Sequence, residues 1–92
     1  GTFTFELQHI PGHSPGSLVY LFKENGFAIV GDVIFQGSIG RTDFPGYGNQ
    51  ESLLKGIREH IMPLPVEMVL FPGHGNPTTV QAELETNPFL KN

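Results

Sequence analysis

The sequence predicts an α/β domain of the layered α+β kind, in which a mainly antiparallel sheet carries two helices on one face. Three observations predict this class: two-residue alternation near the start, short apolar runs bounded by glycine or proline, and two segments with helical spacing. Their order is β-β-β-loop-α-β-α. Because 92 residues suffice for only one core, residues 1–92 are expected to form a single, partial domain.

The first strand is expected within residues 2–9, where apolar and polar side chains alternate. Three apolar side chains occupy alternate positions there, at Phe3, Phe5 and Leu7. This period of two indicates a half-buried strand that ends near His9, before the breaker Pro11-Gly12.

Two further strands are expected in residues 17–23 and 27–30, which are rich in apolar side chains. The connection between them contains Asn25-Gly26, a pair that accepts the positive φ angles of a tight hairpin turn. The first three strands are therefore predicted to form an antiparallel meander.

A glycine-rich segment, residues 36–48, is expected to be a functional or connecting loop without regular structure. A helix should follow it, capped by Asn49 and ended by Pro63. Four apolar side chains share one stripe of this helix: Leu53, Leu54, Ile57 and Ile61.

The last part of the chain predicts one strand and one helix. Residues 68–71 form a continuous apolar run, which indicates a strand buried on both faces. Thr78 and Gln81 match the Thr-x-x-Gln capping box, so the second helix is expected to start at Thr78 and to end before Asn87.

Composition excludes several classes of function. The net charge is −4, from 5 Lys and Arg against 9 Asp and Glu, so nucleic acid and anionic membranes are not expected as partners. There is no cysteine, which excludes thiolate chemistry and disulfides and fits a cytoplasmic protein. No apolar run approaches the roughly 20 residues of a membrane span.

One face of the predicted sheet lacks a cover, because both helices are expected on the other face. Gly1 is not an initiator Met, and strand-like alternation begins directly after it, so we expect the chain to be a piece of a larger domain. The uncovered apolar face then predicts either a missing N-terminal half or self-association through that face.

A tripeptide occurs twice, as Pro11-Gly12-His13 and Pro72-Gly73-His74, each time directly after a predicted strand. Composition alone places it at roughly one position in ten thousand. Asp32 follows the third predicted strand in the same way. Two imidazoles and one carboxylate at strand ends form a donor set that zinc uses in hydrolases.

Each of these residues also has a simpler interpretation. His13 and His74 could be ordinary turn residues, and an isolated Asp after a strand, such as Asp32, usually stabilises a turn or caps a helix. The combination of three such groups favours metal ligands.

Other polar residues have weaker claims. His9 is expected to be a packed histidine or one that orients a ligand, and His60 is expected near a helix C-terminus, where it suits the dipole. Arg41 and Asp43 either form an exposed ion pair or hold the loop and orient the metal ligands.

Four ordered motifs resemble the metallo-β-lactamase superfamily, and most closely its short glyoxalase II-like (hydroxyacylglutathione hydrolase-like) branch. They are HIPGHSPGS at 9–17, GDVIFQGSIGRTDFPG at 31–46, FPGHGNPTT at 71–79 and TNPFL at 86–90. The resemblance implies the C-terminal half of an αββα sandwich.

The resemblance also implies a two-metal site, with zinc as the expected metal and iron or manganese as substitutes. His13 would bind one metal, His74 the other, and Asp32 would bridge both as a ligand and catalytic residue. The family's HxHxDH motif, which supplies the remaining ligands, is absent from this sequence. The 92-residue fragment is therefore expected to be inactive and to bind metal weakly or not at all.

For the intact parent, the resemblance implies hydrolysis of a small thioester or acyl ester by a metal-bound hydroxide. An alternative comes from residues 40–44, GRTDF, which also resemble the iron-dependent persulfide dioxygenase branch. A third hypothesis is that the truncated form is a non-catalytic, self-associating module.

Overall fold

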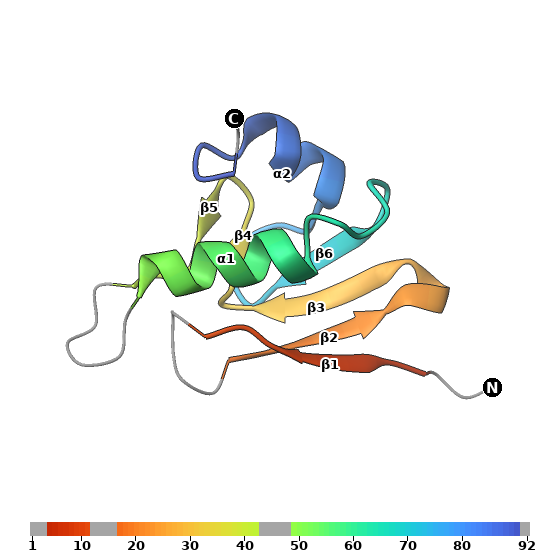
Figure 1. Ribbon diagram of the computed structural model, residues 1–92. Helices are drawn as coiled ribbons and strands as arrows, with labels where there is room; N and C mark the ends of the chain where they lie inside the picture. The colour runs from red at the N-terminus through yellow and green to blue at the C-terminus, as the bar shows by residue number, and fades with distance from the viewer. Residues whose placement is uncertain (1–3, 12–16, 43–48, 91–92) are drawn as a thin grey trace.

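A mixed five-stranded sheet, in the order β1-β2-β3-β6-β7, forms the centre of the computed structural model (Figure 1). The structure describes residues 4–11, 17–42 and 49–90. The strands of this sheet are β1 Glu6–His9, β2 Leu18–Phe22, β3 Phe27–Gly31, β6 Val69–Pro72 and β7 Thr78–Thr79. The remaining elements are the 3-10 helix η1 Lys23–Asn25, the strands β4 Ile34–Phe35 and β5 Ser38–Ile39, and the helices α1 Gln50–His60 and α2 Val80–Thr86.

The predicted antiparallel meander is confirmed, since β1 pairs with β2 and β2 with β3 in antiparallel register. The next neighbour of β3 is β6, and this pair is parallel. The chain reaches β6 by way of the β4–β5 hairpin and α1. The pairing of β6 with β7 is again antiparallel, so the sheet is mainly antiparallel as expected.

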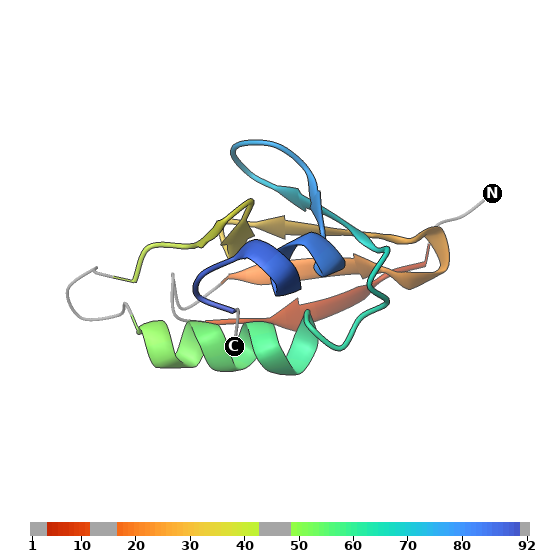
Figure 2. The ribbon, with the colours of Figure 1, turned by 90° about the horizontal axis from the view of Figure 1, so that it is seen from above.

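Both helices lie on the same face of the sheet (Figures 1 and 2), which confirms the predicted layering. The core lies between them and the sheet. Its fully buried side chains include Val19, Val30, Leu53, Ile57 and Leu70. No helix within the described ranges has the length and apolar character needed to cross a membrane.

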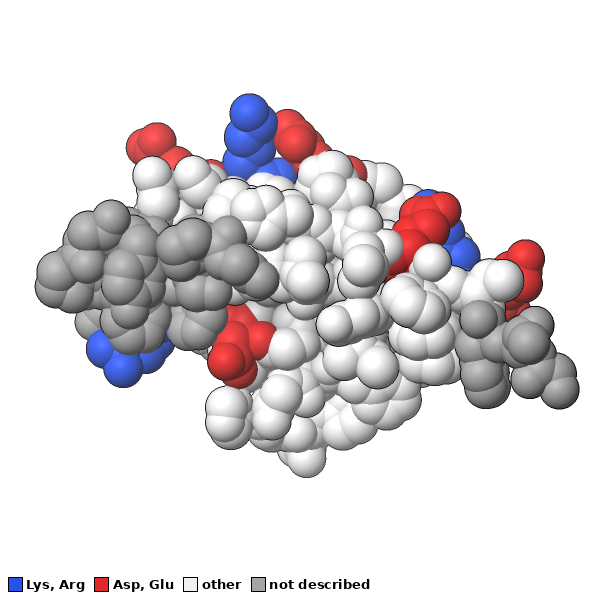
Figure 3. Space-filling model, turned by 90° about the horizontal axis from the view of Figure 1, so that it is seen from below, with Lys and Arg blue, Asp and Glu red and all other residues white. Residues whose placement is uncertain are grey.

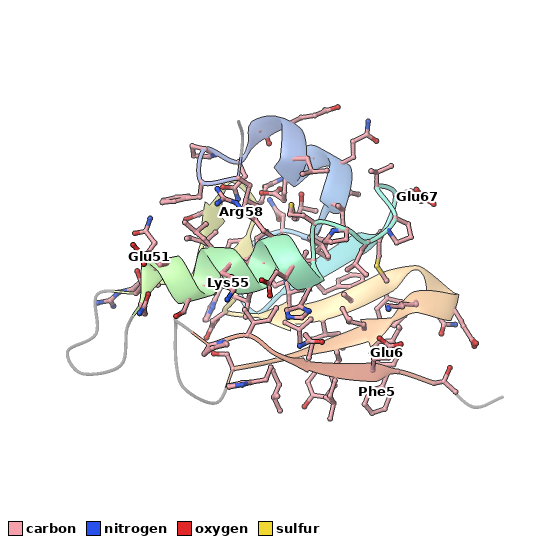
Figure 4. The ribbon with its side chains drawn as sticks, in the orientation of Figure 1. Phe5, Glu6, Glu51, Lys55, Arg58 and Glu67 are labelled. Atoms are coloured by element: carbon pink, nitrogen blue, oxygen red, sulfur yellow. The ribbon has the colours of Figure 1, made fainter. Side chains whose placement is uncertain are left out.

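Helix α1 follows the sequence prediction closely. The side chain of Asn49 accepts a hydrogen bond of 3.0 Å from the Ser52 N–H, which satisfies a donor at the open helix end. The predicted stripe faces the core, while Glu51 and Lys55 extend from the outer side of the helix (Figure 4). Gly56 lies against Ile10: a Cβ atom at Gly56 would be 2.5 Å from Ile10 Cγ2.

Helix α2 starts one residue later than predicted. Thr79, not Thr78, is its N-cap, and its hydroxyl accepts a hydrogen bond of 3.1 Å from the Ala82 N–H. Thr78 belongs to β7, where pairing with Leu70 extends its backbone. Gln81 contacts Glu85 instead of closing a capping box, but the predicted end before Asn87 is correct.

Two turns differ from the predicted ones. The connection between β2 and β3 is not the two-residue Asn-Gly turn. Gly26 has a φ of +78°, as such a turn requires, but Asn25 belongs to the 3-10 helix η1. No described non-glycine residue has a positive φ. Residues 36–48 are also not all irregular, because Ser38–Ile39 pairs with Ile34–Phe35 around Gly37, whose φ is +78°. Strands of two residues are too short for an apolar period to reveal.

The sheet face away from the helices is uncovered within the described chain. Several of its apolar side chains are more than one third exposed: Phe5, Leu7, Leu18, Tyr20, Ile29 and Phe71. Figure 3 views the molecule from below, and uncharged residues dominate the centre of that surface. Figure 4 shows Phe5 on this side of β1. Aromatic side chains contact one another on this face; for example, the ring centroids of Phe5 and Tyr20 lie 5.8 Å apart.

This exposure corrects two expectations. Phe5 and Leu7 were expected to form the buried side of the first strand, but they are 51% and 56% exposed, and Phe3 lies outside the described residues. The segment 68–71 was expected to be buried on both faces, but Phe71 is 41% exposed. The apolar alternation is present, but within the described chain this face of the sheet is exposed.

Candidate metal centre

The side chains of Asp32 and His74 meet at one end of the sheet. Asp32 follows β3, and His74 lies two residues beyond β6. Since β3 and β6 are parallel neighbours with Gly31 opposite Pro72, both residues leave the sheet at the same edge. Oδ1 of Asp32 lies 3.2 Å from Nδ1 of His74, although the residues are 42 positions apart.

Two glycines shape the backbone at this edge. Gly31 has a φ of +53°, and the register of β3 and β6 shifts next to it. The Gly73 N–H donates a 2.9 Å hydrogen bond to the Gly31 carbonyl, which holds the two strand ends together. A Cβ atom at Gly73 would lie 3.2 Å from Asp32 Oδ1, so the absence of a side chain there makes room for the carboxylate.

The pair is open to solvent and to ligands. The His74 side chain is 82% exposed and that of Asp32 is 43% exposed. The centroid of the Phe35 ring, from β4, lies 6.3 Å from the centroid of the His74 ring. As an exposed ion pair or hydrogen bond, this contact would contribute less than about 1 kcal/mol of stability. Stability is therefore a weak explanation for the arrangement.

The donor atoms fit a shared metal ion. Two ligands at about 2.1 Å from a tetrahedral zinc lie about 3.4 Å apart, close to the observed separation of 3.2 Å. Carboxylate oxygen and imidazole nitrogen are both ligands that zinc, iron and manganese accept. Within residues 4–11, 17–42 and 49–90, no third His, Cys, Asp or Glu completes the cluster. His13, the third predicted ligand, lies outside the described residues.

The other predicted residues have varied positions. Arg41 is exposed and borders a surface hollow together with Gln50 and Phe89. Asp43 lies outside the described residues, so the expected ion pair between Arg41 and Asp43 stays a prediction. His9 is exposed at the end of β1, not packed as one interpretation held. His60 is the last residue of α1, as expected, and its Nε2 lies 3.3 Å from the Gln8 amide nitrogen.

Sequence reasoning missed two buried polar residues, one in α2 and one at its C-cap. Glu83 and Asn87 are fully buried, and they contact the β4–β5 hairpin, which follows Asp32 in the chain. A signal for them was present. Val80, Glu83 and Asn87 share the helical spacing of a buried stripe, so two polar side chains occupy positions that usually carry apolar ones.

Comparison with known proteins identifies the family. A model described as the metallo-beta-lactamase superfamily matches residues 1–74. The chain therefore belongs to the metallo-β-lactamase superfamily, as its motifs predicted. It is 47% identical over 88 residues to the hydroxyacylglutathione hydrolase GloC of Haemophilus influenzae, covering 96% of this chain and 41% of that protein. It is 50% identical over 90 residues to the probable metallo-hydrolase YqgX of Bacillus subtilis, covering 98% and 42%.

Solved structures agree with this assignment. The crystal structure of the BLEG-1 B3 metallo-β-lactamase superposes with a TM-score of 0.92 at 48% identity, over 100% of this chain and 44% of that chain. TTHA1623 in a di-iron-bound form gives a TM-score of 0.88 at 40% identity, over 98% and 44%. The chain spans about two fifths of the length of the curated relatives that it matches.

Proposed function

We propose that the whole protein is a metal-dependent hydrolase of small thioesters or related acyl esters, of the glyoxalase II-like type. The observation that carries this proposal is the contact between Asp32 and His74 at the ends of adjacent parallel strands. The relative named hydroxyacylglutathione hydrolase supports the thioester class, since it is 47% identical over almost the whole chain.

In this proposal Asp32, His74 and His13 are metal ligands. A metal ion held there would polarise the substrate carbonyl and lower the pKa of water, so that hydroxide is available to attack that carbonyl. Asp32, which directly follows β3, would hold the metal through its carboxylate, as a ligand common to both metals. His74 presents a ring nitrogen from the loop after β6, and the open surface leaves space for substrate.

Zinc is the first choice of metal, because two imidazoles and a carboxylate are a common zinc donor set in hydrolases. Iron and manganese remain alternatives. The related structure of TTHA1623 in a di-iron-bound form supports iron in particular. Metal analysis of the purified whole protein by inductively coupled plasma mass spectrometry would identify the resident ion.

The proposal is tested with the whole, metal-loaded protein and a panel of hydroxyacyl-glutathione thioesters and simple esters. Asp32→Ala and His74→Ala are each expected to lower kcat/KM by about 100-fold or more and to weaken metal binding. His60→Ala is the matched control, because this imidazole belongs to α1 and contacts Gln8. Absence of turnover on every substrate, or full activity of Asp32→Ala, would refute the proposal.

A second candidate function is an iron-dependent, persulfide dioxygenase-like oxidation, which the motif at residues 40–44 favours. Oxygen consumption with glutathione persulfide, together with one iron per chain, would support it. Two metals per chain and hydrolysis without oxygen consumption would support the hydrolase. We prefer the hydrolase because the relative with a named activity is a hydrolase.

We further propose that the uncovered sheet face is buried in the parent protein by the remainder of its own domain. The 92-residue chain alone is then expected to be catalytically inactive and to self-associate through this face. Light scattering that finds a stable, folded monomer of the 92-residue chain would contradict self-association.

A further inference from the structure

A buried polar cluster connects the segments that follow Asp32 and His74 in the chain. Its centre is the Glu83 side chain on α2, which has no exposed surface. Asn87, one helical turn later, is also fully buried. Burying a carboxylate costs free energy unless several hydrogen bonds compensate it. The hydrogen-bond donors around Glu83 therefore show how the structure compensates the cost of burying its carboxylate.

Glu83 accepts three hydrogen bonds from three different segments. Thr78 Oγ1, in β7, donates to Oε2 at 2.6 Å. The Gly37 N–H, in the turn between β4 and β5, donates to Oε1 at 2.9 Å. Asn87 Nδ2 donates to the same Oε1 at 2.9 Å. One carboxylate thus joins α2 to both neighbouring segments.

Asn87 extends the cluster. Its Nδ2 also donates to the Ser38 carbonyl at 3.0 Å, which fixes β5, and its Oδ1 accepts the Phe89 N–H at 3.0 Å. No buried side-chain nitrogen or oxygen in the described chain lacks a hydrogen-bond partner. The cluster is therefore fully satisfied, a condition under which buried polar networks make a structure rigid.

The attachment points lie close in sequence to the candidate ligands. Gly37 lies in the hairpin that begins two residues after Asp32, and Thr78 begins the strand that follows the His74 loop. We propose that Glu83 is a positioning residue that fixes the Asp32 and His74 segments relative to each other, so that both can hold one metal centre. This inference rests on the proposed function, since it assigns Glu83 to the same site.

Loss of stability alone does not identify a positioning residue. Removing one partner from a buried hydrogen-bonded cluster leaves the other groups unsatisfied and costs stability. Glu83→Leu leaves the Gly37 N–H and the Thr78 hydroxyl without an acceptor, so it is expected to destabilise the fold whatever the role of Glu83. A positioning role predicts in addition that Glu83→Leu damages the metal site.

The test compares Glu83→Leu, Glu83→Gln and Val80→Ala in the whole protein. Val80 is a buried apolar residue of the same helix, so its truncation reports loss of stability without loss of these hydrogen bonds. The glutamine amide can keep its oxygen toward Gly37 and Asn87 and donate from its nitrogen to Thr78 Oγ1. Glu83→Gln is therefore the conservative variant expected to retain the site.

The readouts are the zinc dissociation constant from chelator competition, the visible spectrum of the cobalt(II)-loaded protein, and thermal stability. Glu83→Leu is expected to weaken zinc binding about 10- to 100-fold and to change the cobalt spectrum. Glu83→Gln should stay within about threefold of wild type, and Val80→Ala should lower thermal stability with unchanged affinity.

Two results would overturn the inference: zinc affinity and cobalt spectrum unchanged in Glu83→Leu, or equal losses of affinity in Glu83→Leu and Val80→Ala. If Glu83→Leu does not fold, Thr78→Val takes its place in the test, because it removes only one of the donors to Glu83. A smaller loss of zinc affinity is then expected, and an unchanged zinc affinity would count against the proposal. A wild-type protein that binds no metal would refute the proposed function itself, which distinguishes the two failures.

Discussion

Gly73 leaves open the space next to the Asp32 carboxylate, because a Cβ atom on Gly73 would lie 3.2 Å from Oδ1 of Asp32. That separation is tighter than ordinary van der Waals contact, so an added methyl group requires a shift of a few tenths of an ångström. The carboxylate would have to move relative to His74. The glycine of the second Pro-Gly-His sequence thus acts on the candidate site through Asp32.

Gly73→Ala is expected to weaken zinc binding of the whole protein about tenfold, because the displaced carboxylate loses its position beside His74. Thermal stability should change little, since Gly73 is not among the described glycines with positive φ. Chelator competition measures the affinity. Asn76→Ala, an exposed change in the same loop, is the control. Equal affinities of Gly73→Ala and wild type would show that Asp32 accommodates the methyl group.

Gly56→Ala is expected to destabilise the protein although alanine favours helices. The new Cβ would lie 2.5 Å from Cγ2 of Ile10, and overpacking of this kind costs about 1–3 kcal/mol against a helix gain of about 1 kcal/mol. Denaturant titration of the whole protein measures the loss. Ile10→Ala should cost less in the Gly56→Ala background than in wild type. Additive effects of the two changes would contradict direct contact.

Ile29→Lys is expected to destabilise the whole protein by several kcal/mol, or to prevent its folding, because it would bury an unpaired ammonium between β3 and a covering layer. Val66→Lys is the matched control: Val66 is 47% exposed and Ile29 is 43% exposed, but Val66 lies outside the sheet. In the 92-residue chain, Ile29→Lys should instead reduce self-association, measured by light scattering. Equal stability of the two whole-protein variants would argue against a cover on this face.

Asn49→Ala is expected to lower the free energy of unfolding by about 1 kcal/mol, because it removes the side-chain acceptor for the Ser52 N–H at the start of α1. Gln50→Ala, at the exposed first position of the helix, should change it by less than about 0.5 kcal/mol. Denaturant titration of the whole protein compares the two. A loss no larger than that of Gln50→Ala would mean that water replaces the cap.

Local patterns were sufficient to predict the meander, helix α1 and its cap at Asn49, because each depends on residues close in sequence. They were not sufficient to predict which faces are covered. Alternation shows that Phe5 and Leu7 share a face, but it does not show whether another layer covers that face, and within the described chain both side chains are exposed. The parallel neighbours β3 and β6 likewise depend on tertiary packing.

The candidate site was predictable to a similar extent. Chemistry and placement at strand ends selected Asp32 and His74 as candidates, and the structure brings their side chains together. Their role as metal ligands stays a prediction, as do the roles of His13 and Asp43, which lie outside the described residues. The helical spacing of Glu83 with Val80 and Asn87 was a signal that Glu83 faces the core. Its role as an acceptor for Gly37, which is 46 positions away, could not be predicted, because no local pattern reveals a contact of that range.

From the parallel alignment of β3 and β6, we expect the Asp32–His74 pair to form late in folding. The meander closes short loops, whereas β3 and β6 meet only after the β4–β5 hairpin and α1 have been accommodated between them, at a larger entropic cost. An ion held by both side chains would bind the folded chain and not the unfolded one. Metal supply would then raise the folded fraction by mass action, and so influence how much of the protein escapes degradation.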